Sequence, residues 1–227
     1  MIDHVQDLAA LREATDRLLS AAASLDETAL AEPSRLPGWT RGHVLAHLAR
    51  NADALVNVLQ GLPMYVSGEA RDQDIERDAP RPPAVQLADV RDTAARFDAE
   101  GAVPADWERL VELRNGVTDR AARVPFRRLQ EIELHHVDLG IGYELEDLPE
   151  RFTGQETDFL ADRFSGLATV PPTRLLAGGR EWRTGGREGG EVTVSGSPAD
   201  LVGWLAGRRD GAALTVSGGP LPVLPPL

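Results

Sequence analysis

The sequence contains no cysteine. This absence excludes disulfide bonds, a cysteine nucleophile and thiolate ligands for zinc, so any thiol chemistry needs sulfur from a small-molecule cofactor. The sequence also has no run of about 18 apolar residues, so no membrane-spanning helix and no membrane partner are predicted. The N-terminal segment carries acidic residues and has no apolar signal core, and we therefore expect a cytoplasmic protein.

Positive charge is scarce as well. Lys and Arg together number 24 against 36 Asp and Glu, which gives a formal net charge of −12 at pH 7. A nucleic-acid partner favours a basic face, so this balance argues against one. Neither a phosphate-binding glycine loop nor a Gly-x-Ser-x-Gly motif occurs, which leaves little support for nucleotide binding or serine hydrolysis. With 227 residues, 42% of them hydrophobic, the chain can form one large globular domain or two smaller ones.

Hydrophobic periodicity predicts four main helices in the first part of the chain, at about residues 4–24, 40–59, 84–100 and 125–139. Thr40 is a suitable N-cap, and Pro125 suits a first helical turn. The polar segment 64–83 is predicted to be a long loop of the kind that forms lids or binding loops, and 107–123 a short strand or connector. Four helices of this kind suggest a bundle, whose core is a common place for metal sites.

The composition changes near residue 143, and the segment 144–154 is predicted to be a linker. A helix at about 155–168 follows, and then short β-prone runs with glycine-rich turns, a further helix and a last strand. We place the domain boundary near residue 150. The predicted fold class is therefore α+β, with an N-terminal helical bundle over residues 1–150 and a small C-terminal α/β domain over 151–227.

The strongest functional signal is a polar stripe on the predicted helix 125–139. Steps of four and seven residues return a helical side chain to nearly the same direction, so Glu131, His135 and Asp138 share one stripe. His136 is rotated by about 100° from His135 and should face elsewhere. A solvated helix face is the ordinary explanation of such a stripe. Apolar neighbours indicate, however, that this helix is partly buried, which favours metal ligation.

A second histidine-bearing helix can complete a metal site. His47 lies in the apolar run VLAHLA, where an imidazole needs a buried partner, whereas His43 lies in the first turn, where a helix-end role is favoured. We therefore predict that His47, Glu131 and His135 hold one divalent metal ion and leave coordination positions open, as catalytic sites do. The same donor set suits Fe(II) oxygenases, but those sites usually lie on β-barrels, so helices disfavour that alternative.

Two arginines are candidate anion-binding residues. Arg208 is predicted to end a helix in the second domain, where any cation is favoured by the helix dipole. The functional interpretation is a two-pronged clamp for a carboxylate. For Arg208, residue spacing alone favours the helix-end interpretation. Arg71, in the predicted polar loop, can likewise be an ordinary surface cation or an anion-binding residue.

Four motifs, in order along nearly the whole chain, resemble the mycothiol-dependent maleylpyruvate isomerase family, which belongs to the DinB-like metal-dependent helical bundle superfamily. They are PGWTRGHVLAHLARNAD, MYVSGEARDQDIE, RRLQEIELHHVDLGIGY and ADLVGWLAGR. The resemblance implies an N-terminal DinB-like four-helix bundle that holds a divalent metal, usually zinc, and a smaller C-terminal α/β domain. It carries the family's site residues onto His47, Glu131, His135, Asp138, Arg208 and Arg71. The first three are the ligands already chosen from helical geometry.

The resemblance also implies an activity: cis–trans isomerisation of maleylpyruvate to fumarylpyruvate, as in gentisate-type aromatic degradation, by reversible addition of the mycothiol thiolate. The metal would lower the pKa of the thiol. Arg208, with Arg71, would hold the dicarboxylate substrate, and Asp138 would orient a histidine or carry a proton. Two alternatives stay open, a mycothiol S-transferase and a non-catalytic DinB-like binding protein. We expect a monomer whose partners are mycothiol and the substrate.

Overall fold

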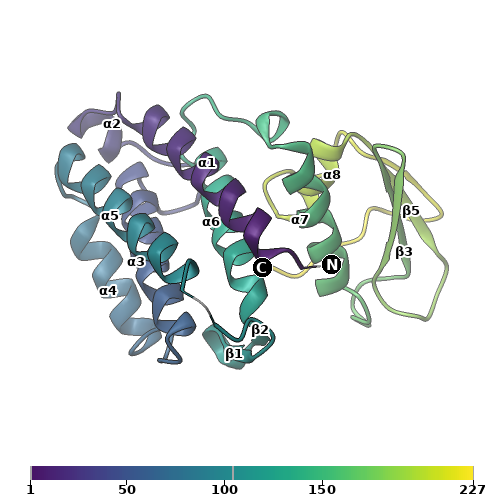
Figure 1. Cartoon of the computed structure of the whole chain (residues 1–227). Helices are drawn as coiled ribbons and strands as arrows, with labels where there is room; N and C mark the ends of the chain where they lie inside the picture. Colours follow the sequence, from purple (N-terminus) through teal and green to yellow (C-terminus); the bar gives the residue numbers. More distant parts are fainter. Residues whose placement is uncertain (1, 104, 227) are drawn as a thin grey trace. The chain divides into compact units, whose positions relative to one another are not determined.

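The computed structural model describes residues 2–103 and 105–226 (Figure 1). The chain divides into two compact units, Met1–Tyr143 and Glu144–Leu227. This division falls slightly before the boundary expected near residue 150, because the segment that follows Tyr143 packs within the second unit: the 3₁₀ turn η3 (Leu145–Asp147) contacts helix α8 (Pro198–Leu205). None of the helices in the described residues combines the length and the apolar character needed to cross a membrane.

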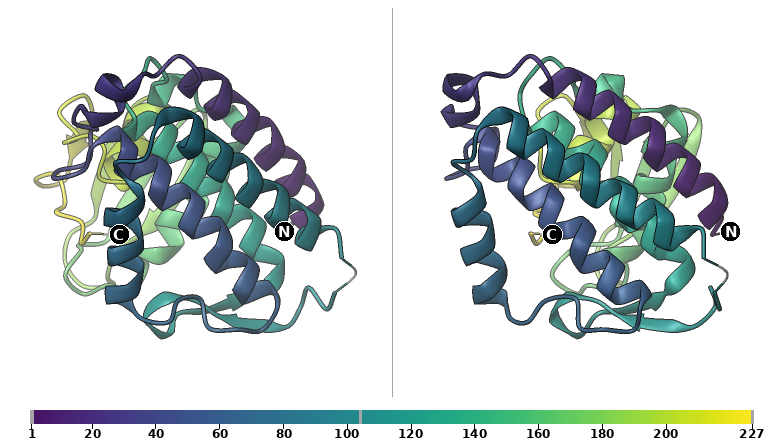
Figure 2. Two further views of the ribbon diagram at one scale, coloured as in Figure 1. Left: turned by 90° about the vertical axis from the view of Figure 1, so that its left-hand side faces the viewer. Right: turned by 60° about the vertical axis from the view of Figure 1, so that its left-hand side comes forward.

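The first unit is built on four long helices, α1 (His4–Ala22), α3 (Arg41–Leu59), α5 (Pro83–Gly101) and α6 (Val124–Asp138). Helix α5 packs against both α1 and α3, and α6 packs against the same two helices. Figure 2 shows α5 between α1 and α3, with α6 behind them in the left-hand view. Apolar residues at helical spacing, such as Leu18, Leu48 and Ile132, are fully buried between them. The predicted four-helix bundle is confirmed.

Helix α3 begins where the sequence indicates. The Thr40 hydroxyl accepts a hydrogen bond from the backbone N–H of His43, and the His43 ring Nδ1 accepts one from the backbone N–H of Thr40 at 3.2 Å. These two bonds form a capping box, which satisfies amides that the first helical turn leaves without partners. His43 therefore has the helix-end role expected for it.

The polar segment predicted as a loop contains an additional helix, α4 (Gly68–Asp78), so that prediction was wrong for these residues. Ser67 caps it by accepting a hydrogen bond from the backbone N–H of Ala70 at 3.0 Å. Only two of its residues, Ile75 and Asp78, are buried, and two buried positions are too few to produce a visible hydrophobic period. The helix packs against α3.

Two short strands connect α5 to α6. Strands β1 (Leu110–Glu112) and β2 (Thr118–Arg120) pair in antiparallel register with Leu110 opposite Arg120. The turn between them contains a 3₁₀ segment, η1 (Arg114–Gly116), in which Asn115 has a φ of 59°. Asparagine and glycine tolerate this left-handed conformation, which allows the chain to reverse. The short turn η2 (Ala121–Arg123) then leads into α6, where Pro125 lies in the first turn as expected. The short helix α2 (Glu27–Ala31) lies between α1 and α3 in the sequence.

The second unit combines two helices with a small mixed sheet. Its strands are β3 (Thr173–Ala177), β4 (Arg180–Thr184), β5 (Val192–Ser195) and β6 (Thr215–Ser217), in the order β4-β3-β5-β6. Only the β3–β5 pair is parallel. These strands and α8 confirm the predicted α/β domain.

Helix α7 (Glu150–Arg163) begins about five residues earlier than predicted and therefore includes part of the expected linker. Pro149 precedes its first turn, and Phe152, near its start, is buried together with Leu160. A proline at a helix entrance and one early aromatic anchor are enough to start the helix there, but they are weak signals of periodicity.

Candidate metal centre

Three side chains of the first unit converge on one point. His47 comes from α3, and Glu131 and His135 come from α6; one potential ligand atom from each lies within 4.8 Å of the others. Oε2 of Glu131 is 2.9 Å from Nε2 of His47 and 3.1 Å from Nε2 of His135. The two imidazoles meet edge to face at 88°. Two nitrogens and one oxygen at this separation are the donor set of a divalent metal with open coordination positions.

Exposure differs within the cluster in a way that suits ligand entry. The two histidines are buried, whereas 32% of the Glu131 side chain remains exposed. The buried imidazoles are fixed by their helices, because α3 and α6 pack against each other. Access from solvent is therefore available at the carboxylate side.

The pKa values of the cluster follow from burial and from its internal hydrogen bonds. Burial lowers the pKa of His47 to about 4 and keeps its imidazole neutral. Burial opposes ionisation of Glu131, but hydrogen bonds from His135 and His47 outweigh it and hold the carboxyl pKa well below its ordinary value. Burial likewise opposes charge on His135, but bonds to Asp138 and Glu131 raise its pKa. A neutral imidazole and an ionised carboxylate are the forms that bind metals.

Asp138 lies one helical turn beyond His135 on α6. Its Oδ2 is 2.8 Å from Nδ1 of His135, and its side chain is 1% exposed. An Nδ1–H that donates to this carboxylate leaves Nε2 free to face Glu131, which is the usual arrangement around metal-binding histidines. Of the two roles considered for Asp138, burial favours orientation of His135 over contact with a substrate proton.

Arg71 reaches the same cluster from α4. Its Nη2 lies 3.2 Å from Nδ1 of His47, and its Nη1 donates to Asp72 at 2.7 Å. A guanidinium can only donate, so Nδ1 of His47 is the acceptor and the imidazole proton is on Nε2, toward Glu131. The Arg71 guanidinium also lies over the Tyr65 ring, 5.9 Å from the ring centre. The helix missed in the sequence is therefore the element that brings Arg71 to the cluster.

Arg128 and Asn51 extend the cluster by one turn along the α3–α6 interface, and the sequence did not indicate either residue. Arg128 Nη1 donates to Oδ1 of Asn51 at 2.8 Å, and the residue is 1% exposed. Its Nη2 is buried and has no hydrogen-bond partner among the described residues. Burial lowers the pKa of this guanidinium to about 10. Arg128 lies three residues before Glu131, so helical arithmetic places it on the ligand stripe. Arginine is so rarely buried that the sequence does not predict its location.

Arg208 belongs to the second unit. Its backbone N–H donates to the carbonyl of Gly203 at 2.7 Å, and its Nη1 donates to the carbonyl of Ala206, also at 2.7 Å. The residue follows α8, which ends at Leu205, and these carbonyl contacts are those of a cation at a helix C-terminus. Substrate binding by Arg208 stays a prediction.

The comparisons with known proteins cover both units. A family model described as the mycothiol maleylpyruvate isomerase N-terminal domain matches residues 11–140, and the MDMPI C-terminal domain model matches residues 145–226. Two solved structures match 99% of this chain and 97% of theirs with a TM-score of 0.85 and 28% identity. They are the crystal structures of the mycothiol-dependent maleylpyruvate isomerase and of a histidine-to-alanine mutant of it. A search of curated protein sequences gives no match.

The two matched units define the chain as an isomerase with a helical bundle and a separate α/β domain. The N-terminal model alone spans more than half of the 227 residues. The chain therefore belongs to the mycothiol maleylpyruvate isomerase family, as its sequence motifs indicated.

Proposed function

We propose that this protein is a zinc-dependent isomerase that converts maleylpyruvate to fumarylpyruvate with mycothiol as its thiol cofactor. The observation that carries the proposal is the convergence of His47, Glu131 and His135 within 4.8 Å in a chain of this family. Nε2 of each histidine faces Oε2 of Glu131, so these three atoms would hold the ion. Zinc bound there would lower the pKa of an incoming thiol and make a thiolate available near neutral pH.

The reaction requires a nucleophile that the protein lacks. A carbon–carbon double bond must become a single bond before it can rotate, and a thiolate that adds to the alkene achieves this by passing the electron pair into an enolate. Rotation and departure of the thiolate then give the trans isomer. The sequence has no cysteine, which is why the sulfur must come from mycothiol.

Arg71 is the residue of the first unit that is best placed to bind a substrate carboxylate. When His47 uses Nε2 as a ligand, its remaining proton is on Nδ1, and this N–H no longer accepts from Arg71. The guanidinium then needs another acceptor at the edge of the cluster, and a carboxylate of the substrate provides two oxygens. Arg208 is assigned to the second carboxylate or the enolate on the family resemblance, and Asp138 to the orientation of His135.

Two measurements test the proposal. Protein purified without added metal should contain close to one zinc per chain. His47→Ala should lose this zinc, whereas His4→Ala, outside the cluster, should retain it.

Mycothiol at a small fraction of the maleylpyruvate concentration should support complete conversion, because an isomerase returns the thiol. Stoichiometric loss of mycothiol would identify an S-transferase instead. Absence of both metal and turnover would favour a binding protein. Cytoplasmic location and a monomeric state stay predictions.

A further inference from the structure

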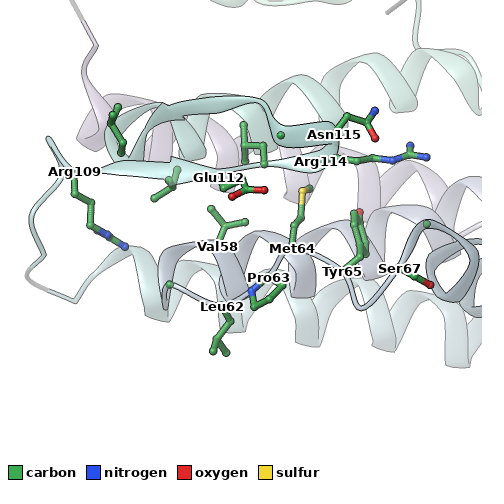
Figure 3. Close-up of a pocket in the computed structure, with 16 residues that line it drawn as sticks. Val58, Leu62, Pro63, Met64, Tyr65, Ser67, Arg109, Glu112, Arg114 and Asn115 are labelled. Atoms are coloured by element: carbon green, nitrogen blue, oxygen red, sulfur yellow. The ribbon is translucent and has the colours of Figure 1, made fainter.

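A cavity of about 710 Å³ lies in the first unit, and Tyr65 is among its lining residues. It is enclosed by the end of α3, the segment 61–68 that follows it, and residues 109–116 of the β1–β2 connection (Figure 3). Cavities of roughly 300–1,000 Å³ are the usual size for small-molecule sites. The lining mixes apolar groups such as Val58 and Met64 with polar groups that can donate or accept hydrogen bonds.

One end of this cavity is connected to the metal cluster through Arg71. Figure 3 shows Tyr65, Ser67 and Arg114 at one end and Arg109 at the other. The Arg71 guanidinium lies 5.9 Å from the centre of the Tyr65 ring, and its Nη2 lies 3.2 Å from Nδ1 of His47. A molecule whose reactive group is at the cluster can therefore extend past Tyr65 into the cavity.

Two of the charged groups that line the cavity are available for a ligand. Glu112 and Arg114 are exposed, and neither side chain forms a hydrogen bond or an ion pair within the described part of the chain. In contrast, Arg120 lies on the same hairpin outside the cavity lining, and its guanidinium pairs with Glu108 at 2.7 Å. Arg109 is committed to the fold, since it donates to the carbonyls of Leu59 and Asp106. The Arg114 guanidinium and the Glu112 carboxylate therefore remain as a donor and an acceptor for a ligand, and both line the cavity.

We propose that the cavity binds the hydroxyl-rich, sugar-like body of mycothiol, with the thiol directed past Tyr65 to the metal cluster. A polyol offers both donors and acceptors, which match the Arg114 guanidinium, the Glu112 carboxylate and the Asn115 amide. The apolar part of the lining suits the C–H face of a sugar ring. The dicarboxylate substrate fits less well, because Glu112 repels it and it is too small to fill about 710 Å³. This inference rests on the proposed function.

Steady-state kinetics of the zinc-loaded protein test the assignment. Arg114→Ala and Glu112→Ala should each raise KM for mycothiol about tenfold, which corresponds to one lost charged hydrogen bond, and should leave KM for maleylpyruvate and kcat nearly unchanged. Arg120→Ala is the matched control on the same hairpin and should behave as the wild type. An unchanged KM for mycothiol, or equal increases for both substrates, would overturn the assignment.

Calorimetric titration without maleylpyruvate separates this inference from the proposed function. The wild type should bind mycothiol, and it should also bind S-methyl mycothiol, which has no thiol to ionise but keeps the polar body. Arg114→Ala should weaken both complexes about tenfold. Arg114→Ala binding with wild-type affinity refutes the cavity assignment. A different outcome would be that the wild type binds mycothiol, Arg114→Ala binds it more weakly, and maleylpyruvate is not converted. That outcome refutes the proposed function and supports the assignment of the cavity to mycothiol.

Discussion

Nδ1 of His135 and Oδ2 of Asp138 are 2.8 Å apart on consecutive turns of α6. This contact fixes the direction of the His135 ring, so that Nε2 faces the point shared with Glu131 and His47. Asp138 is the last residue of α6, and its carboxylate has little freedom to move because it is buried. We therefore expect loss of this hydrogen bond to weaken metal binding more than it destabilises the fold.

Asp138→Asn should weaken zinc binding about 10- to 100-fold, as loss of a carboxylate behind a histidine ligand usually does. Competition with a chromophoric chelator measures this change directly. Asp72→Asn, at an exposed aspartate that pairs with Arg71 and lies outside the ligand cluster, is the control and should retain wild-type affinity. Wild-type zinc affinity in Asp138→Asn would show that the hydrogen bond does not orient the ligand.

Arg71→Ala should raise KM for maleylpyruvate about tenfold or more and leave the zinc content unchanged, because a bidentate guanidinium–carboxylate contact is lost. Metal analysis and steady-state kinetics on one preparation separate the two effects. Arg77→Ala is the matched control on α4, since the Arg77 side chain is 58% exposed and pairs with Asp74 and Asp78 instead of the cluster. A loss of zinc in Arg71→Ala would contradict its assignment to the substrate.

The sequence was sufficient for the three clustered residues because their placement depends on local periodicity. Glu131 and His135 are four residues apart on one helix, and His47 is in the middle of an apolar run on another, so both stripes had to face the bundle core. The contact between those stripes required only that α3 and α6 be neighbours, which is a common outcome in a four-helix bundle.

The rest of the site depends on contacts that have no local signal. Arg71 is on a helix with only two buried residues, and Tyr65 precedes that helix in an irregular segment, so their approach to His47 is visible only in three dimensions. Arg128 was overlooked for a different reason. Its position on the ligand stripe could be read from the sequence, but a buried guanidinium held by one asparagine contradicts the ordinary preference of arginine for solvent.

The metal-free protein should lose stability as the pH falls from 6.5 toward 4. The pKa of His47 is lowered by burial from 6.5 to about 4, so in this interval the unfolded chain binds a proton that the folded protein does not. The full effect is on the order of 3 kcal/mol. The other two groups change the stability outside this interval. Glu131, whose pKa is lowered, contributes to the pH dependence below pH 4.5, and His135, whose pKa is raised, contributes above pH 6.5.

Urea unfolding of chelator-treated protein at several pH values measures this dependence. His47→Leu removes the titrating group and should flatten the slope between pH 4.5 and 6.5, whereas His4→Leu should leave it as in the wild type. Equal slopes in the wild type and in His47→Leu would show that His47 titrates normally in the folded protein.

Substitution of the two members of the buried pair Arg128 and Asn51 should destabilise the protein to different extents. Asn51→Ala removes the amide oxygen that accepts from the buried guanidinium and should destabilise the protein by about 2–3 kcal/mol. Arg128→Met removes the buried charge itself and should cost less, on the order of 1 kcal/mol, because desolvation of the guanidinium is no longer required.

Zinc affinity distinguishes an electrostatic role of Arg128 from a purely structural one. The guanidinium is one helical turn from Glu131 and repels a divalent cation, so Arg128→Met should bind zinc about 3- to 10-fold more tightly and bind anions such as the mycothiol thiolate more weakly. Chelator competition and thiol titration measure these two opposite changes. A variant that binds both zinc and thiol more weakly would show that Arg128 acts through packing, since loss of packing disturbs the site for every ligand.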